Sequence, residues 1–360
     1  MRPNVLILSL LLLSCSDQKS KTSEHHIESG FQVAELEDSG IQRDSIYKLL
    51  TLIKKTPPRD FRGLVVIKND RLVMEEYFNT YLSNTIHDIR SAGKSITALL
   101  LGIAMKDGLI DDLDQDVHSF FSKKKYTSIN EDYKKIRIRH LLNMSSGLDA
   151  DSNDPQTAGH SSNWISLDNW RKYHLSIPMT SEPGTKWIYA DINPMLIGAI
   201  IEETSGMSLK DYAAMKLFKP LGINQFYWYT NAANQTGAAG NLYLSTIDFA
   251  KLGVLVLNKG KWENSQIISE EYMNELSRKT FDISDTNPFA DAYGMLWYKS
   301  SRTFGTNSIK YLFASGMGGN HLIVIPEKEM VIALTSSAYG QGYGHQRSYN
   351  IMARIFESLH

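Results

Sequence analysis

Apolar residues recur along the middle of the chain with the spacing of α-helices. The segments with this spacing are residues 91–107, 193–204, 208–218 and 246–258. Short β-rich runs lie on either side of this middle region. The early run "GLVVIKNDRLVMEEYF" is divided by Asn69-Asp70, which predicts a hairpin. The later runs, each bounded by turn residues, predict four more strands: "GMLWYKS", "IKYLFAS", "NHLIVIP" and "MVIALTSS".

Strands near both ends of the chain, with helices between them, favour one antiparallel sheet built from about 60–90 and 290–340. The helices between these regions predict an inserted helical subdomain at about 95–245. The last segment, "GHQRSYNIMARIFESLH", fits a terminal helix packed on the sheet. We therefore expect a mixed α/β (α+β) fold with helices flanking the sheet. A cleft between the sheet and the helical region is a common place for a site.

The first residues have the pattern of an export signal. Arg2 precedes an apolar run from Val5 to Leu13, which is too short to span a bilayer as a mature helix. The stretch "LLSC" resembles a bacterial lipobox and implies that residues 1–15 are a lipoprotein signal, with Cys15 lipidated. The alternative is an ordinary cleaved signal peptide. We expect residues 16–40 to be a flexible tether, 41–360 to be the folded domain, and the protein to be anchored in the bacterial cell envelope.

Composition narrows the possible partners. The 360 residues are 42% hydrophobic and 21% charged, which suits a sizeable core. With 38 basic and 39 acidic residues, the net charge of -1 provides no long-range field for nucleic acid. A small, weakly charged substrate is the default expectation. Because Cys15 is the only cysteine, the chain forms no internal disulfide.

Ser91 and Lys94 stand out as candidate chemical groups. Their spacing of three puts both side chains on one face of a strongly apolar helix. A buried lysine has a destabilised charge and can then take part in moving the serine proton. Ser-x-x-Lys alone is weak, because it also begins at Ser16, Ser45 and Ser122. The structural alternative is that Ser91 caps the helix while Lys94 extends to solvent.

Two later segments add to this motif. They are "EPGTKWIYADINPMLIGAIIEETSG", with a turn before Tyr189, and "FASGMGGNHLIVIP", with a Gly-rich turn between strands. With Ser91-Ala-Gly-Lys94, they resemble the three signature elements of serine β-lactamases and penicillin-binding proteins. The sequence is most similar to the class C β-lactamase-like group, which includes esterases, D-amino peptidases and 6-aminohexanoate-dimer hydrolases. "RHLLNMSSGLD" and "AAGNLYLSTIDFAKLG" also resemble segments of that group, and the resemblance covers roughly residues 60–358.

The resemblance implies a role for each matching residue. Ser91 matches the acylated nucleophile, Lys94 its partner in proton transfer, and Tyr189 the general base that later protonates the leaving group. A phenol titrates near a pKa of about 10, so Tyr189 needs neighbours that stabilise its phenolate. The backbone amides of Ser91 and Met317 match the oxyanion hole. Gly316 and the glycines after it would allow close approach of backbone and substrate.

Two departures from the group bear on the substrate. The chain has Asp191 two residues after Tyr189, where the β-lactamases have asparagine, and a carboxylate cannot donate an amide hydrogen bond. Asn193 would supply an amide only if the turn presents it inward. At the third motif, Ala314-Ser315-Gly316 lacks the cation that would attract a substrate carboxylate. We therefore expect uncharged esters or amides to be better substrates than penicillins or D-Ala-D-Ala peptides.

Motifs for other chemistries are absent from the sequence. It contains no Gly-x-Ser-x-Gly elbow, zinc motif, P-loop or dinucleotide fingerprint, so we expect no metal or organic cofactor. Three aromatic or histidine features stay open. His321 would either line the pocket or point into the sheet, while "QFYWYT" and Trp297-Tyr298 would either wall an acyl pocket or pack in the core.

The sequence thus predicts a serine hydrolase that works through an acyl-enzyme. Two alternatives within enzymes are a β-lactamase and a D-Ala-D-Ala-type or D-amino peptidase. The alternative from another class is a binding protein that holds cell-wall peptides or a lipid-like ligand. Intact Ser91, Lys94 and Tyr189 favour the enzyme, whereas Asp191 keeps the binding protein open.

Overall fold

The computed structural model describes residues 30–122, 124–127, 129–305 and 307–359. The predicted signal, the lipidation site Cys15 and most of the predicted tether lie outside the described residues. Within the described part of the chain, no helix is both long enough and apolar enough to cross a membrane.

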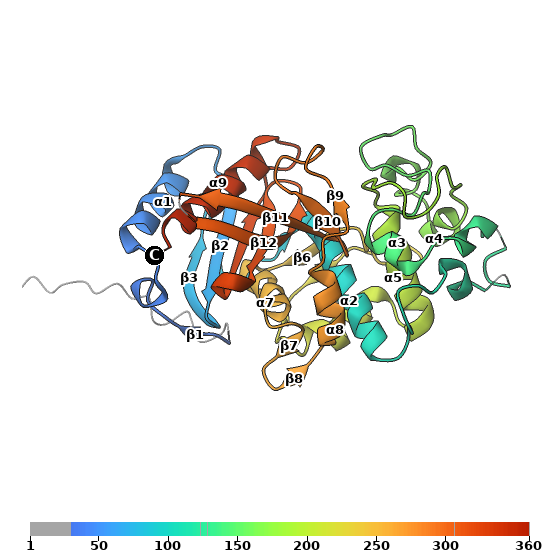
Figure 1. Ribbon diagram of the computed structural model, residues 1–360, viewed down its shortest axis with the longest axis horizontal. Helices are drawn as coiled ribbons and strands as arrows, with labels where there is room; N and C mark the ends of the chain where they lie inside the picture. Colours follow the sequence, from blue (N-terminus) through green and yellow to red (C-terminus); the bar gives the residue numbers. More distant parts are fainter. Residues whose placement is uncertain (1–29, 123, 128, 306, 360) are drawn as a thin grey trace, which may run out of the picture.

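A nine-stranded sheet forms the centre of the fold (Figure 1). Its strands lie in the order β1-β3-β2-β14-β13-β12-β11-β10-β9, and every pair is antiparallel except β1 and β3. Their bounds are β1 Gln32–Val33, β2 Phe61–Lys68, β3 Arg71–Tyr77, β9 Phe281–Asp282, β10 Ala292–Gly294, β11 Trp297–Phe304, β12 Asn307–Gly316, β13 Asn320–Ile325 and β14 Met330–Ser336.

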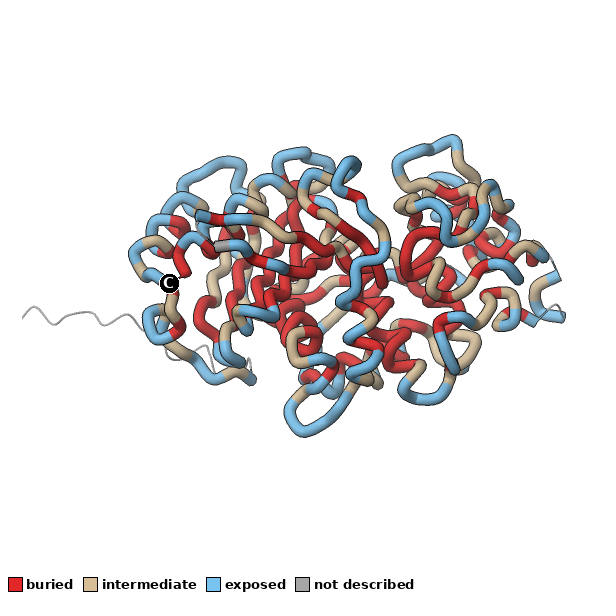
Figure 2. The backbone as a smooth tube through the Cα atoms, in the orientation of Figure 1, coloured by how far each residue is buried: buried red, intermediate tan, exposed pale blue. Residues whose placement is uncertain are grey.

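The pairing of β2 with β14 brings an early and a late segment of the chain together inside this sheet. The register runs from Lys68 opposite Met330 to Phe61 opposite Ser336. Every residue of β13 and β14 is buried, because helices cover both faces of the sheet at this point. Figure 2 shows the buried positions concentrated there and in the adjoining helices.

Helices α1 and α9 pack together on one side of the sheet, and α7 packs against β2, β13 and β14 (Figure 1). A second group is centred on α5, which contacts α2, α3, α4 and α6. The helix bounds are α1 Arg43–Lys55, α2 Gly93–Lys106, α3 Ile138–Leu142, α4 Trp170–His174, α5 Ile192–Ser205, α6 Leu209–Ala213, α7 Thr246–Leu257, α8 Glu270–Leu276 and α9 Tyr343–Glu357.

Local sequence explains where the helices beside the site begin and end. The side chain of Ser245 accepts a hydrogen bond from the Asp248 amide and so caps α7. Helix α5 ends at Gly206, whose φ of 70° lies in the left-handed region that terminates helices. Helix α2 is buried over nearly its whole length, which matches its run of apolar residues.

The predicted fold class is confirmed. The hairpin forms at Asn69 and Asp70, both with positive φ, and the four late runs form β11 to β14. Helices also form in the four segments that had helical spacing. The segment 208–218 differs in detail, because α6 continues as a π-helix over Ala214–Phe218.

Three local expectations need correction. β4, His87–Asp88, belongs to a separate three-stranded sheet with β6, Leu242–Leu244, and β5, Tyr227–Trp228, rather than to the central sheet. The predicted helical region therefore contains strands. Residues of the predicted tether also join the sheet, because β1 pairs with β3. The sequence analysis did not predict α1, α8, β9, β10 or the β7–β8 hairpin, Lys261–Trp262 with Ser265–Gln266.

Candidate active site

Ser91 lies in a short 3-10 turn, Arg90–Ala92, directly before α2. The Nζ atom of Lys94 is 2.9 Å from Ser91 Oγ. Lys94 is only 2% exposed, so it does not extend to solvent. Ser91 is not the cap of α2 either, because the N-cap position belongs to Ala92. The structure therefore contradicts the alternative in which Ser91 caps the helix and Lys94 extends to solvent.

Lys94 makes two further polar contacts, both with segments distant in sequence. Its Nζ atom donates to the Ala239 carbonyl at 2.7 Å and forms an ion pair with Asp191 Oδ1 at 2.8 Å. A lysine ammonium has three N–H donors and no acceptor. Ser91 Oγ, the Ala239 carbonyl and Asp191 Oδ1 match these three donors. In this arrangement Lys94 Nζ donates a hydrogen bond to Ser91 Oγ.

Tyr189 reaches the same serine from the turn before α5. Its ring centroid is 5.1 Å from Lys94 Nζ, and Ser91 and Tyr298 both influence the ionisation of its phenol. Burial raises the pKa of Tyr189, and the charge of Asp191 raises it further, while Ser91 and Tyr298 lower it. The net direction is upward, so the neutral phenol predominates near pH 7.

The end of β12 packs directly against the turn that carries Ser91. A Cβ atom at Gly316 would lie 2.0 Å from the Ile89 carbonyl oxygen, so only glycine permits this approach. Met317 follows immediately and shares a pocket with Ser91. This packing brings together the two residues whose backbone amides match an oxyanion hole.

The pocket above Ser91 has a volume of about 260 Å³. Ser91, Lys94 and Asp191 are among its polar lining residues. Its walls are largely aromatic and aliphatic, with Trp164 packed edge to face on Trp170 at 5.5 Å. These wall residues are Trp164, Ile165, Trp170, Met195, Tyr229 and Met317. Tyr189 does not line this pocket and contacts the site through its hydroxyl.

Several predicted substrate-binding residues do not line the pocket. Asn193 is 1% exposed, and its Nδ2 atom lies 3.3 Å from Met144 Sδ. Ala314 is fully buried and pairs with Leu322, while Ser315 pairs with His321 in the β12–β13 ladder. Gly316 contributes to the site because its lack of a side chain allows β12 to pack against the turn at Ile89. The turn before α5 therefore presents Asp191, and not Asn193, to the pocket.

The open aromatic and histidine features are resolved by burial. His321 is 4% exposed, and its Nε2 atom is 3.0 Å from His345 Nδ1 of α9, so it points into the fold. Trp297 is fully buried in the core, whereas its neighbour Tyr298 contacts Tyr189. In "QFYWYT", Trp228 is buried and Tyr229 lines the pocket.

Sequence reasoning missed Arg90, which also lines the pocket. Its backbone has a φ of 54°, and its guanidinium carbon lies 4.2 Å from the centroid of the Tyr339 ring. Its Nε atom is 3.2 Å from Asp88 Oδ2. Burial raises the pKa of Asp88, and contacts with Arg90 oppose that rise. Arg90 directly precedes Ser91, so its position in the sequence was the available signal.

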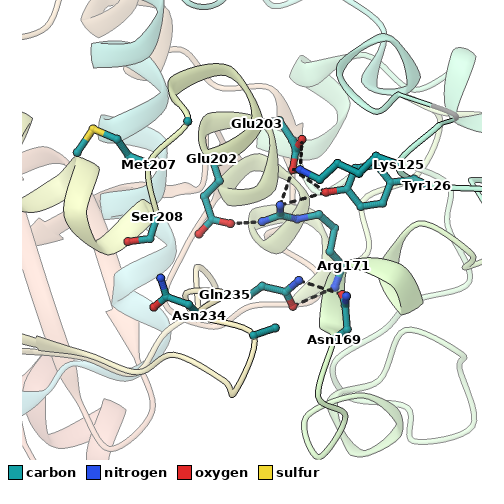
Figure 3. A pocket seen from close by; sticks show the side chains of 12 residues that line it. Lys125, Tyr126, Asn169, Arg171, Glu202, Glu203, Met207, Ser208, Asn234 and Gln235 are labelled. Atoms are coloured by element: carbon teal, nitrogen blue, oxygen red, sulfur yellow. Dashed lines mark hydrogen bonds and ion pairs between the residues drawn. The ribbon is translucent and has the colours of Figure 1, made fainter.

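A second, more polar cavity of about 500 Å³ shares no lining residue with the Ser91 pocket. Figure 3 shows Arg171 between Glu202 and Glu203, with Lys125 also directed at Glu203. The charged groups of this cavity thus pair with one another. Among the described residues, no group of three or more His, Cys, Asp or Glu side chains is arranged to hold a metal ion.

Comparisons with known proteins identify the family of this chain. The sequence model of the Beta-lactamase family matches residues 58–354. A putative D-alanyl-D-alanine carboxypeptidase of Escherichia coli O157:H7 is 24% identical over 94% of this chain and 91% of its own length.

Solved structures show the same fold. A putative 6-aminohexanoate-dimer hydrolase from Bacillus anthracis has a TM-score of 0.70 and 21% identity, over 91% of this chain and 88% of the other. A D-stereospecific amidohydrolase from Streptomyces sp. has a TM-score of 0.66 and 16% identity, over 88% and 98% of the two chains. With more than half of its length matched by the family model, the chain belongs to the Beta-lactamase family and is a serine hydrolase.

Proposed function

We propose that this enzyme hydrolyses a small, uncharged ester or amide through an acyl-enzyme on Ser91. The observation that carries the proposal is the position of Ser91 Oγ. It lies 2.9 Å from the buried Lys94 Nζ and in a pocket with largely apolar walls.

The proposed reaction begins with Tyr189 as phenolate. It removes the Ser91 proton as Oγ attacks the substrate carbonyl, and Lys94 holds Ser91 Oγ in place by its hydrogen bond. The amides of Ser91 and Met317 stabilise the oxyanion of the tetrahedral intermediate. Tyr189 then gives its proton to the leaving alcohol or amine as the bond to the carbonyl carbon breaks. Water enters, and Tyr189 removes its proton as the water oxygen attacks the acyl carbonyl. The bond between the carbonyl carbon and Ser91 Oγ then breaks, Tyr189 returns the proton to Oγ, and the acid is released.

The preference for an uncharged substrate is supported by charge pairing. Lys94 is paired with Asp191, and Arg90 lies beside Asp88. A substrate carboxylate that bound to Lys94 or Arg90 would compete with an existing ion pair. The carboxylate would also have to lose its hydrating water. The third motif has Ala314 and no cation. The walls formed by Trp164, Trp170 and Met195 instead favour burial of an apolar group.

The first experiment compares two chromogenic substrates. The purified protein should hydrolyse p-nitrophenyl butyrate and leave a chromogenic cephalosporin nearly untouched, and Ser91→Ala should abolish ester turnover. Ser265→Ala, an exposed position in β8, is the matched control and should retain full activity. Rapid cephalosporin turnover would restore the β-lactamase alternative. Ester turnover that survives Ser91→Ala would disprove the proposed nucleophile, and inactivity on both substrates would favour the binding protein.

We also propose that the protein is held in a bacterial cell envelope by lipid on Cys15. The support is the lipobox-like "LLSC" after an apolar run. Cells fed an azide-bearing fatty acid should label the full chain, and Cys15→Ser should remove the label and release the protein from membranes. Label that persists in Cys15→Ser would contradict this proposal.

A further inference from the structure

The carbonyl that accepts a hydrogen bond from Lys94 lies in a short segment between β5 and β6, residues 237–240. The Ala239 oxygen is 2.7 Å from Lys94 Nζ. The next residue, Gly240, packs against the turn that carries the nucleophile, because a Cβ atom at Gly240 would lie only 3.6 Å from the Ser91 amide nitrogen. This segment therefore contacts both the lysine and the backbone of the serine. Its position determines where the two groups lie relative to each other.

Thr97 donates a hydrogen bond to this segment from α2. It is fully buried in a largely apolar helix, one turn after Lys94. A threonine hydroxyl in a helix can donate to the carbonyl four residues earlier. Here that carbonyl, of Gly93, is 3.4 Å from Oγ1, whereas the Ala238 carbonyl is 2.8 Å away. The single hydroxyl proton therefore goes to Ala238, which directly precedes Ala239.

Trp228, in β5, holds the same segment by its indole. Its side chain is 1% exposed, and its Nε1 atom is 3.0 Å from the carbonyl oxygens of both Gly237 and Gly240. Because an indole has one N–H, the two ends of the segment share this donor. A buried carbonyl that loses its donor is costly. Removal of the Thr97 hydroxyl or the Trp228 N–H should therefore shift the segment toward other donors.

We propose that Thr97 and Trp228 are positioning residues that hold the Ala239 carbonyl in place. That carbonyl accepts from Lys94, whose Nζ atom lies 2.9 Å from Ser91 Oγ. The described residues that line the pocket include neither Thr97 nor Trp228, so both affect the chemical step and not the binding of substrate. This inference rests on the proposed function, in which Lys94 holds Ser91 Oγ in place.

The test is steady-state hydrolysis of p-nitrophenyl butyrate by the full chain carrying Thr97→Val, which has nearly the same shape but no hydroxyl. We expect kcat to fall about tenfold to a hundredfold with little change in KM, because Lys94 is no longer held at a fixed distance from Ser91. Thr97→Ser keeps the donor and should restore most of kcat. Trp228→Phe lacks the N–H and should also lower kcat. A normal kcat in Thr97→Val or in Trp228→Phe overturns the role of that residue.

Thr335→Val is the matched control. Thr335, in β14, is also fully buried, and its Oγ1 atom lies 2.7 Å from Thr246 Oγ1. The same substitution there removes a buried hydrogen bond that does not involve segment 237–240. It should lower the melting temperature and leave kcat unchanged. If Thr97→Val and Thr335→Val change kcat equally, or if Thr97→Ser loses as much as Thr97→Val, the effect is one of general packing and the inference is overturned.

A second pair of variants applies if Thr97→Val does not fold, as judged by circular dichroism. Thr97→Cys and Thr97→Ser differ in one atom, and a thiol donates only weakly. The Thr97→Cys protein should have the lower kcat. Equal values of kcat in the two proteins would overturn the role of Thr97.

Parallel measurements on Ser91→Ala and Lys94→Met separate this inference from the proposed function. Activity that survives in both proteins would disprove the proposed function. Loss of activity in both, combined with a normal kcat in Thr97→Val and Trp228→Phe, would leave the proposed function intact and reject only the positioning role.

Discussion

At the scale of one residue, Lys94 is buried beside Ser91, and each of the three N–H donors of its ammonium has an acceptor. Its three contacts come from the turn before α2, from Ala239 and from Asp191, so segments far apart in sequence fix one ammonium. An ion buried without such partners would cost several kcal/mol, roughly, and would destabilise the fold. The same contacts hold the lysine beside the serine.

Lys299 is a buried lysine with weaker compensation. It is 4% exposed and donates to the Gly294 carbonyl at 2.5 Å, and burial lowers its pKa to about 7. The unfolded chain binds this proton up to about pH 10, and the folded protein releases it near pH 7. The contribution of Lys299 to the free energy of unfolding is therefore largest at high pH and decreases as the pH falls toward 7.

The free energy of unfolding should consequently rise between about pH 7 and pH 9, with a contribution approaching ~1.4 kcal/mol per pH unit from this group. Urea unfolding of Lys299→Met should lack that contribution. Lys310→Met removes the same charge from an exposed position in β12 and should keep the wild-type slope. Equal slopes for Lys299→Met and the wild type would contradict this account.

At the scale of elements, the site depends on how closely β12 approaches the turn before α2. The missing side chain of Gly316 allows this approach, and Gly240 also packs against the turn, at the Arg90 carbonyl. These contacts fix the distance between Ser91 and Met317. The proposed oxyanion hole therefore depends on packing between two segments that are more than two hundred residues apart.

Gly316→Ala should lower both stability and activity. The added methyl would clash with the Ile89 backbone, which cannot move aside as a flexible side chain would, so we expect a loss of about 1–3 kcal/mol or more. Displacement of β12 should also lower kcat for p-nitrophenyl butyrate more than it raises KM. Gly342→Ala, where a methyl would meet nothing within 4 Å, should leave both unchanged. A fully active, fully stable Gly316→Ala would show that the approach is not needed.

At the scale of the whole molecule, the sheet ties both ends of the described chain into one unit. Ile41 pairs with Leu359, and Phe356 of α9 is fully buried with its ring 5.0 Å from Phe304. Phe356→Ala should cost about 3–5 kcal/mol through loss of burial and the cavity left behind. We expect the fold to unfold as one cooperative unit, so activity and circular dichroism should be lost at the same, lower temperature. Loss of α9 alone, with an active site that survives heating, would contradict this.

The sequence could predict what depends on local pattern. Helical spacing identified α2, α5 and α7, and the Ser91-Lys94 spacing predicted two side chains that contact each other, Lys94 Nζ and Ser91 Oγ being 2.9 Å apart. Helix α1 carried a similar signal in Ile46, Leu49 and Leu50, which was overlooked. Arg90 could be assigned to the site because it directly precedes Ser91, but Trp164 and Tyr298 could not be assigned by local pattern. The positions of these two residues depend on which distant segments pack together, and the orientation of Asn193 depends on a turn whose geometry the sequence does not specify.

The pairing of β2 with β14 has a consequence for the order of synthesis. The chain makes the apolar β2 at residues 61–68, but its partner at residues 330–336 comes near the end. Before β14 has been synthesised, the backbone N–H and C=O groups along one edge of β2 have no partner strand. This edge can then pair with another exposed strand edge. The nascent chain must therefore be shielded, by the ribosome, by chaperones or by export in an unfolded state, over most of its own length.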